Sequence, residues 1–190
     1  MPEQIKYFVP GPVYVLEEVR AALLAPVVVH RSPEFMPVYK RITEALKPVF
    51  RTTRDVYLAT SSATFLMEAA LTSLVERDVL HLTNGAFSER WREIGQSLGR
   101  ASDQIAAPWG EIVDPELVRQ ALRRKRYEAV TVAHNETSTG VANPLREIAR
   151  VVREESEALL LVDAVSSLAG LPLESDAWGL DFVFAGVQKG

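Results

Sequence analysis

Residues 181–190 read Asp-Phe-Val-Phe-Ala-Gly-Val-Gln-Lys-Gly, a short apolar run followed closely by a lone lysine. Because the run is brief and rich in β-branched and aromatic residues, it predicts a buried strand over 181–185, with Lys189 just past its carboxyl end. Residues 158–163 repeat the pattern with the opposite charge, as Ala-Leu-Leu-Leu-Val-Asp. The sequence therefore predicts a lysine and a carboxylate, Asp163, at the carboxyl ends of two buried strands.

A lysine and an aspartate in such positions have a specific chemical use. The lysine amine can form a Schiff base with pyridoxal 5′-phosphate, and the carboxylate can keep a proton on the pyridine nitrogen so that the ring accepts electrons. An ordinary interpretation is also open at this point, because a strand-end lysine can simply be solvated and a strand-end aspartate can cap the next helix.

An alternation of strand and helix patterns fills the chain from residue 56 onward. Strands are predicted over 56–59, 79–82, 103–107, 129–133, 158–162 and 181–185, and helices over 64–76, 87–98, 114–125 and 144–155. Such alternation predicts an α/β fold of three layers, with a mostly parallel sheet covered by helices on both faces. Because ligands of these folds bind outside the carboxyl ends of the strands, the residues after each strand are the candidates for chemistry.

Residues 1–55 show a different pattern. Residues 1–12 are expected to be extended, because the stretch Pro10-Gly11-Pro12 disfavours helix. A short helix is expected over 15–24, followed by a loop over 25–35. Apolar residues then recur at four-residue intervals, which predicts an amphipathic helix with Val38, Ile42, Leu46 and Phe50 on one face.

Polar or small residues follow several of the predicted strands. The run 60–64, Thr-Ser-Ser-Ala-Thr, opens a helix, where free amides and hydroxyls form an anion site, although the same residues also serve as ordinary helix caps. Phe87 follows an Asn-Gly turn and is either a flat surface for a ring or a core residue. The run 134–140, His-Asn-Glu-Thr-Ser-Thr-Gly, is too polar for a core, and it either offers hydroxyls to a ligand or forms a simple turn.

Composition limits the classes of function. The chain has 190 residues, a net charge of -4 and a pI near 5.5, which argues against a nucleic-acid partner; we interpret the basic cluster 123–126 as the solvated end of a helix. It has no cysteine, and its three histidines lack the paired spacing of metal ligands, so no metal site is predicted. It opens without a signal-peptide pattern and has no apolar run near the ~20 residues of a membrane span. These features predict a cytoplasmic protein without a membrane partner.

Taken together, these stretches resemble the class V, fold-type I pyridoxal-phosphate aminotransferases. Within that family they most resemble the alanine–glyoxylate, serine–glyoxylate and serine–pyruvate aminotransferase group. The resemblance runs from Pro10-Gly11-Pro12 to Lys189, with the motifs in order at the strand ends. It implies that Lys189 is the Schiff-base lysine and that Asp163 is the partner of the pyridine nitrogen, which makes these two the expected catalytic residues.

The resemblance also implies the other cofactor contacts. Phe87 and Val165 resemble the residues on the two faces of the ring, and Thr137 resembles the hydroxyl near the phenolate oxygen. The expected phosphate ligands are Ser62, Ala63, Thr64 and Gln188.

Two residues of the phosphate loop depart from the family pattern, and two further residues have a weaker implied role. Ala63 stands where the family usually has glycine, and Phe65 where it has another small residue. The methyl group of Ala63 is tolerated only if the backbone there does not need a positive φ. Gly11 and His30 fall in segments that lie near the substrate in this family.

The resemblance further implies a domain organisation and a reaction. Residues 1–30 are expected to be an N-terminal segment and residues 31–190 the large cofactor-binding domain, incomplete because it stops just after the lysine, with the small C-terminal domain and its carboxylate-binding arginine absent. The implied activity is ping-pong transfer of an amino group between a small amino acid (alanine, serine or aspartate) and a small 2-oxo acid, in a homodimer. Two alternatives are a cysteine desulfurase-like lyase on the same fold and a non-catalytic cofactor-binding fragment.

Overall fold

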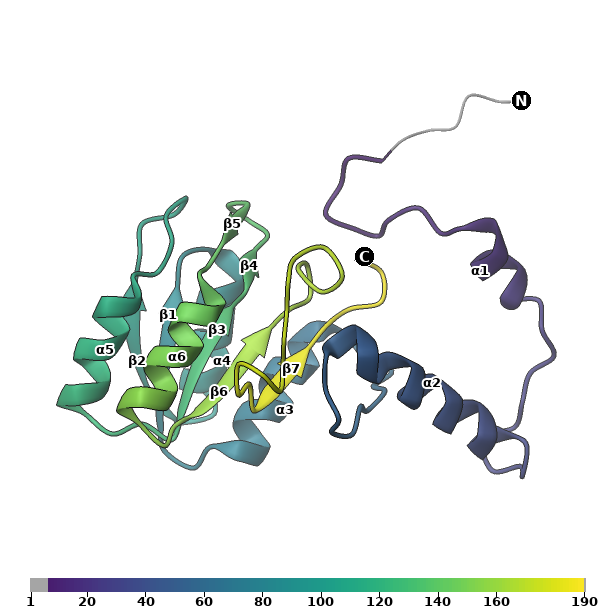
Figure 1. Cartoon of the computed structure of the whole chain (residues 1–190), viewed down its shortest axis with the longest axis horizontal. Helices are drawn as coiled ribbons and strands as arrows, with labels where there is room; N and C mark the ends of the chain where they lie inside the picture. Colours follow the sequence, from purple (N-terminus) through teal and green to yellow (C-terminus); the bar gives the residue numbers. More distant parts are fainter. Residues whose placement is uncertain (1–6, 190) are drawn as a thin grey trace.

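A single five-stranded parallel sheet forms the centre of the structure, a computed structural model that describes residues 7–189. The strands lie in the order β2-β1-β3-β6-β7 (Figure 1). Their bounds are β1 (Asp78–Thr83), β2 (Ala101–Ala106), β3 (Ala129–Ala133), β6 (Leu159–Asp163) and β7 (Phe182–Phe184). The parallel sheet expected from the alternating pattern is confirmed, with all of its carboxyl ends along one edge.

Helices cover both faces of this sheet. Successive side chains of a strand point to opposite faces, and because both faces are apolar, each packs against helices in a separate core. One core joins α5 (Pro115–Arg124) and α6 (Leu145–Glu155) to side chains such as Leu80 and Leu160. The other joins α3 (Ala63–Leu74) and α4 (Ala86–Ser97) to side chains such as Val79 and Leu161. The predicted three-layer arrangement is therefore confirmed (Figure 1).

The polar run 134–140 forms the first strand and the turn of a small hairpin. Its two short antiparallel strands are β4 (Asn135–Glu136) and β5 (Val141–Ala142), which follow directly from the carboxyl end of β3. Gly140 has a φ of 73° just before β5, a conformation that favours glycine. The hairpin therefore stands on the edge of the sheet where ligands of such folds bind.

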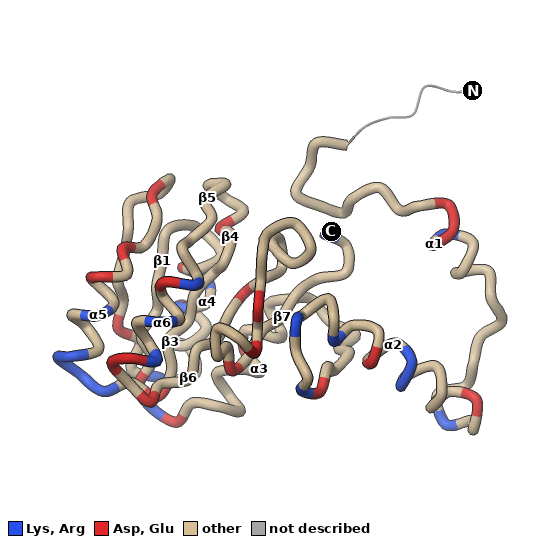
Figure 2. Tube along the Cα trace, viewed as in Figure 1, with Lys and Arg blue, Asp and Glu red and all other residues tan. Residues whose placement is uncertain are grey.

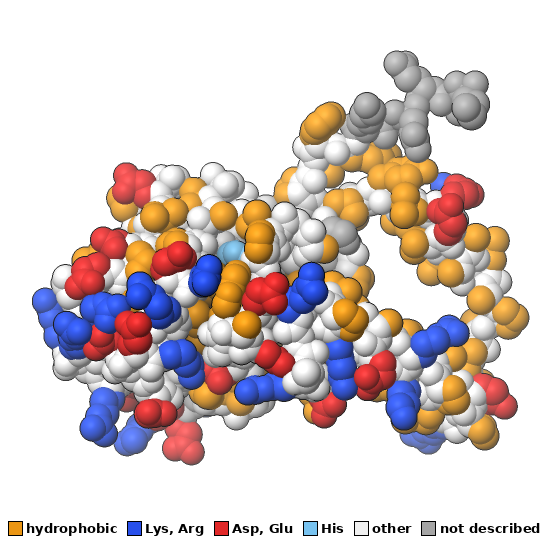
Figure 3. All heavy atoms as spheres, in the orientation of Figure 1, with side chains coloured by type: hydrophobic (Ala, Val, Ile, Leu, Met, Phe, Trp, Pro, Cys, Tyr) orange, Lys and Arg blue, Asp and Glu red, His pale blue; other side chains and the backbone are white. Residues whose placement is uncertain are grey.

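The chain before the sheet forms an arm and a long helix. The arm, residues 7–34, contains α1 (Glu17–Ala22) and extends away from the sheet, and α2 (Phe35–Phe50) leads back to it (Figure 1). The helix predicted over 15–24 is thus shorter than expected, and residues 1–6 of the predicted extended segment lie outside the described residues. Orange apolar side chains are visible along the arm in Figure 3. Exposed examples are Phe8, Leu16, Leu23, Leu24, Val27 and Val29.

The strand predicted over 56–59 is wrong. These residues have no strand hydrogen bonding, and the side chain of Tyr57 is 80% exposed. A run with strand-like composition becomes a strand only where a neighbouring backbone accepts its hydrogen bonds, and within residues 7–189 no strand pairs with it.

Charged residues of both signs lie along α5 and α6 (Figure 2). In the basic cluster 123–126, Arg123 pairs with Glu155 at 2.8 Å, and the Lys125 amine lies 2.8 Å from Asp78 and 2.9 Å from Asp103. The cluster begins in the last turn of α5, at the helix end as predicted, but the Arg123 and Lys125 side chains are ion-paired and not simply solvated. In the part of the chain described, no helix is both long and apolar enough to cross a membrane.

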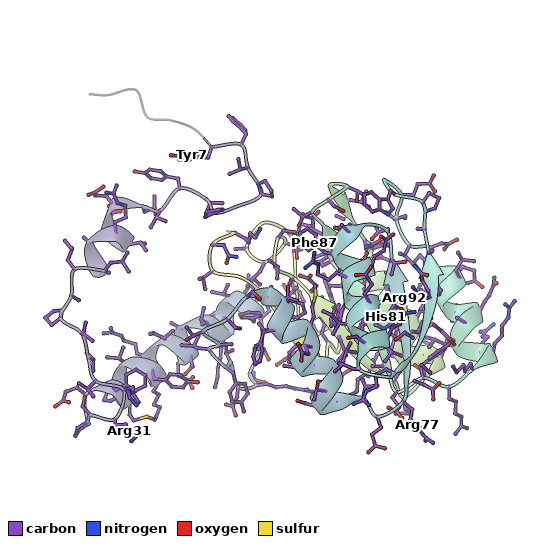
Figure 4. All side chains as sticks on the ribbon, turned by 180° about the vertical axis from the view of Figure 1, so that it is seen from behind. Tyr7, Arg31, Arg77, His81, Phe87 and Arg92 are labelled. Carbon is purple, nitrogen blue, oxygen red and sulfur yellow. The ribbon has the colours of Figure 1, made fainter. Side chains whose placement is uncertain are left out.

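His81 is a buried histidine in β1, beneath α4 (Figure 4). Its Nδ1 lies 2.8 Å from the Thr131 hydroxyl, whereas its Nε2 has no hydrogen-bond partner in the described structure. Burial, assisted by the charge of Arg92, lowers the pKa of His81 from 6.5 to about 3. The unfolded chain therefore binds a proton at this site at a higher pH than the folded chain does.

We expect His81 to make the fold sensitive to acid. Its contribution is fully present above pH 6.5 and is lost as the pH falls toward 3, with a slope of about 1.4 kcal/mol per pH unit in the free energy of unfolding. His81→Asn keeps a nitrogen near the position of Nδ1 but cannot titrate, so its slope should be smaller by that amount. Urea unfolding between about pH 7 and pH 4 measures the slope, with the exposed His30→Asn as control; equal slopes for His81→Asn and wild type would refute the prediction.

Candidate active site

Asp163 ends β6 and points its carboxyl group into a nearly closed environment, with 6% of the residue exposed. The pKa of Asp163 is raised to about 7, mainly by burial and to a smaller extent by the charge of Glu136. The hydrogen bond from the Val165 N–H and the charge of Lys189 act in the opposite direction and lower the pKa. Asp163 Oδ1 accepts that hydrogen bond at 2.8 Å, but the residues that follow form turns and not a helix. The carboxyl group is therefore not an ordinary helix cap, and a cation brought beside it would favour its ionised form.

Lys189 lies beside the N-terminal segment, which is remote from it in sequence. Its amine donates a hydrogen bond of 2.8 Å to the carbonyl oxygen of Pro10, and the Val13 N–H donates one of 3.0 Å to the carbonyl oxygen of Gln188. Residues 10–13 therefore pack across the end of the chain segment that follows β7.

Gly11 allows this close approach. Its φ is +113°, and an added Cβ would lie 2.6 Å from Lys189 Cδ and 2.9 Å from the Gln188 carbonyl oxygen. Both the conformation and the lack of space require glycine. The structure thus places Gly11 beside Lys189. It does not do the same for His30, which is exposed in the loop before α2; its neighbour Arg31 lies at the outer end of that helix (Figure 4).

Thr137 is connected to the segment that carries Asp163. Its hydroxyl donates to the Ser166 hydroxyl at 2.7 Å, and Asn135 Nδ2 donates to the same oxygen at 2.9 Å. Ser166 in turn donates to the Asn135 carbonyl oxygen at 3.1 Å. Ser166 had no predicted role, although a hydroxyl three residues after the strand-end aspartate was a visible signal. The hairpin and the loop after β6 therefore form one hydrogen-bonded unit.

Phe87 and the start of α3 complete the edge. Phe87 lies in the first turn of α4 and is 41% exposed, so it is not a core residue and has a ring surface free for contact (Figure 4). Helix α3 leads into the amino end of β1, so its own N-terminus faces the carboxyl edge of the sheet. Ser62 precedes that helix without capping it through its side chain, and Ala63 is not among the described residues with positive φ. The extra methyl group of Ala63 is therefore accommodated without backbone strain.

These side chains fit pyridoxal 5′-phosphate as a donor set. The first N–H groups of α3 have no partner within the helix, and together with the hydroxyls of Ser62 and Thr64 they suit a phosphate. The buried Asp163 suits a protonated ring nitrogen, the amine of Lys189 suits an aldehyde, and the ring of Phe87 suits a stacked aromatic group. Val165 follows Asp163 and is half-buried, whereas Gln188 is exposed before the lysine.

Comparisons with known proteins agree with this fold and site. The sequence profile of the family described as "Aminotransferase class-V" matches residues 20–190. The serine–glyoxylate aminotransferase of Methylorubrum extorquens is 37% identical, over 96% of this chain and 47% of that protein. A protein of Synechococcus sp. named "Soluble hydrogenase, small subunit" is also 37% identical, over 100% of this chain and 51% of that protein.

Among solved structures, an alanine–glyoxylate aminotransferase from Nostoc sp. matches with a TM-score of 0.90 at 33% identity, over 100% of this chain and 52% of that one. The chain is an α/β protein whose parallel sheet matches that of the solved aminotransferases, with its candidate site at the carboxyl ends of the strands. The chain belongs to the class V aminotransferase family. It spans about half the length of the curated relatives it matches.

Proposed function

We propose that the protein is a pyridoxal-phosphate-dependent aminotransferase that moves an amino group between a small amino acid and a small 2-oxo acid. The observation that carries the proposal is a buried carboxyl group, Asp163, on the same edge of the sheet as the amine of Lys189. The proposal includes residues 31–190 as part of the large cofactor-binding domain. The hydrogenase name describes the Synechococcus protein and adds no residue to this site.

Each residue of the site has a proposed task. Ser62, Ala63, Thr64 and Gln188 would hold the phosphate, Phe87 and Val165 would contact the two faces of the ring, and Thr137 would bond its phenolate oxygen. When bound, the cofactor supplies an electron sink for the negative charge left at the substrate α-carbon.

The two proposed catalytic residues move and hold protons. The Lys189 amine removes the proton from the substrate α-carbon as a general base. The Asp163 carboxylate keeps a proton on the ring nitrogen, because an opposite charge in a buried site favours the protonated form. Gly11, which packs against Lys189, and His30, which is exposed in the loop before α2, are proposed as residues near the substrate.

The named relatives support the choice of substrates. The related proteins of Methylorubrum extorquens and Paracoccus denitrificans are named serine–glyoxylate and L-aspartate–glyoxylate aminotransferases. We therefore propose alanine, serine or aspartate as donors and a 2-oxo acid such as glyoxylate as acceptor, with ping-pong kinetics. The exposed apolar side chains of the arm support a homodimer, because such surface is usually covered by a partner. A cytoplasmic location is part of the same proposal.

Borohydride reduction tests the cofactor assignment directly. Reduction of the native protein with bound pyridoxal 5′-phosphate should fix the cofactor to one lysine, and peptide mass mapping should find it on Lys189. An adduct on Lys6, Lys40, Lys47 or Lys125 would overturn the assignment. Assay of the same protein before reduction separates the alternatives: sulfur release from cysteine would indicate the lyase, and cofactor binding without turnover would indicate the non-catalytic protein.

A further inference from the structure

Glu136, the last residue of β4, has a completely buried carboxylate that contacts the start of α4. Its oxygens accept hydrogen bonds from the backbone N–H groups of Phe87 at 3.3 Å and Ser88 at 2.9 Å. They also accept from the Ser88 hydroxyl at 2.9 Å, the Ser138 hydroxyl at 2.8 Å and the Ser138 N–H at 3.2 Å. The proposed catalytic chemistry uses none of these contacts.

The carboxylate is charged despite its burial. Burial acts to raise the pKa of Glu136, but the hydrogen bonds from Ser88 and Ser138 together outweigh it and hold the pKa below its ordinary value. A negative charge at this point faces free N–H groups in the first turn of α4, where it interacts favourably with the helix dipole. Glu136 therefore caps α4 from another part of the chain.

Gly85 shows that the local sequence is shaped around this contact. An added Cβ on Gly85 would lie 2.5 Å from Glu136 Cγ and 2.5 Å from Ser138 Oγ. Its φ of 168° is ordinary extended backbone, so the glycine is needed for space and not for conformation. The Ser138 hydroxyl also accepts from the Ala86 N–H at 2.9 Å, which closes the cluster.

We propose that Glu136 is a positioning residue that sets the place of the Phe87 ring against the cofactor. The inference rests on the proposed function, in which Phe87 stacks on the cofactor ring. Phe87 belongs to neither apolar cluster of the described residues and is partly exposed, so the position of its ring depends on the backbone that Glu136 holds. Because Glu136 also binds Ser138, it fixes Thr137 between them, and one carboxylate sets the spacing of two cofactor contacts.

The test is the affinity of the native protein for pyridoxal 5′-phosphate. Glu136→Gln keeps the shape but replaces one accepting oxygen with an NH₂ group, which leaves buried N–H groups without an acceptor. We expect its cofactor dissociation constant to rise roughly tenfold, equivalent to about 1.4 kcal/mol, and the visible circular dichroism of the bound cofactor to change. Phe87→Leu should weaken binding too. The losses in the double variant should be less than the sum of the two single losses, because Glu136 acts in part through the Phe87 ring and in part through Thr137.

Two further variants serve as a control and as a second test of the positioning role. Glu128→Gln makes the same change to a carboxylate that lies away from the carboxyl edge of the sheet. That carboxylate accepts hydrogen bonds from the backbone N–H groups of Glu76 at 2.6 Å and Arg77 at 2.9 Å. This control variant should bind the cofactor with unchanged affinity. Ser138→Ala removes one donor and should produce a smaller change in the same direction, so it decides the matter if Glu136→Gln does not fold.

The outcomes are distinct. Unchanged affinity and dichroism in Glu136→Gln, or independent additive losses in Glu136→Gln and Phe87→Leu, would overturn the positioning role while the proposed function stands. A wild-type protein that binds no pyridoxal 5′-phosphate would overturn the proposed function and this inference together.

Discussion

Replacing Lys189 with alanine should abolish turnover while leaving the fold in place. The variant loses the amine proposed to bond the cofactor and to take the α-proton, so the rate should fall by roughly 10⁴-fold or more, the upper range for general acid–base catalysis. Its side chain is on the loop after β7, outside both apolar cores, so thermal stability should change little. The measurement is the single-turnover change in cofactor absorbance when an amino-acid donor is added.

A matched lysine and a small amine complete this experiment. Lys40 is exposed on α2, and Lys40→Ala should keep the wild-type rate. A small primary amine added to Lys189→Ala should restore part of the lost rate, because it can act as a base in the vacated space. A rate for Lys189→Ala within about tenfold of wild type would mean that another group supplies the base.

Replacing Asp163 with asparagine should keep cofactor binding but lose most of the rate. Asparagine preserves the shape and can hydrogen-bond, but it brings no charge to hold the proton on the ring nitrogen. Losing about 3–5 kcal/mol of transition-state stabilisation corresponds to roughly 10²–10⁴ in rate. A rate within threefold of wild type would leave Asp163 with only a structural role.

Stability gives Asp163→Asn a second readout of opposite sign. The pKa of Asp163 is raised from 3.8 to about 7 in the folded protein, so its stabilising contribution is present at low pH and is lost as the pH rises through 7. Without cofactor, Asp163→Asn should therefore be more stable than wild type above pH 7, because no buried charge forms. A slower and more stable variant is expected of a functional carboxylate, whereas a structural one should give a less stable variant.

The fold and the strand-end positions of Asp163 and Lys189 could be predicted because both depend on local sequence patterns. Asp163 and Lys189 each follow an apolar run, so their positions depend on one strand each and on the parallel topology. The strand predicted over 56–59 failed because composition reports preference but not the presence of a pairing neighbour. Contacts between segments that are distant in sequence could not be predicted from local patterns. Nothing near Glu136 in sequence shows that its carboxylate meets α4, 48 residues earlier.

The hydrogen bond between Pro10 and Lys189 joins residues 179 positions apart, and this has a consequence for biosynthesis. Contacts of such separation form late in folding, because the intervening chain must be ordered first. A chain made from its N-terminus presents residues 10–13 early, but the residues to which they attach emerge only after the five strands of the sheet that the structure describes. Lys189 is therefore synthesised after these five strands, and a shorter nascent chain lacks the amine that the proposed function assigns to the cofactor.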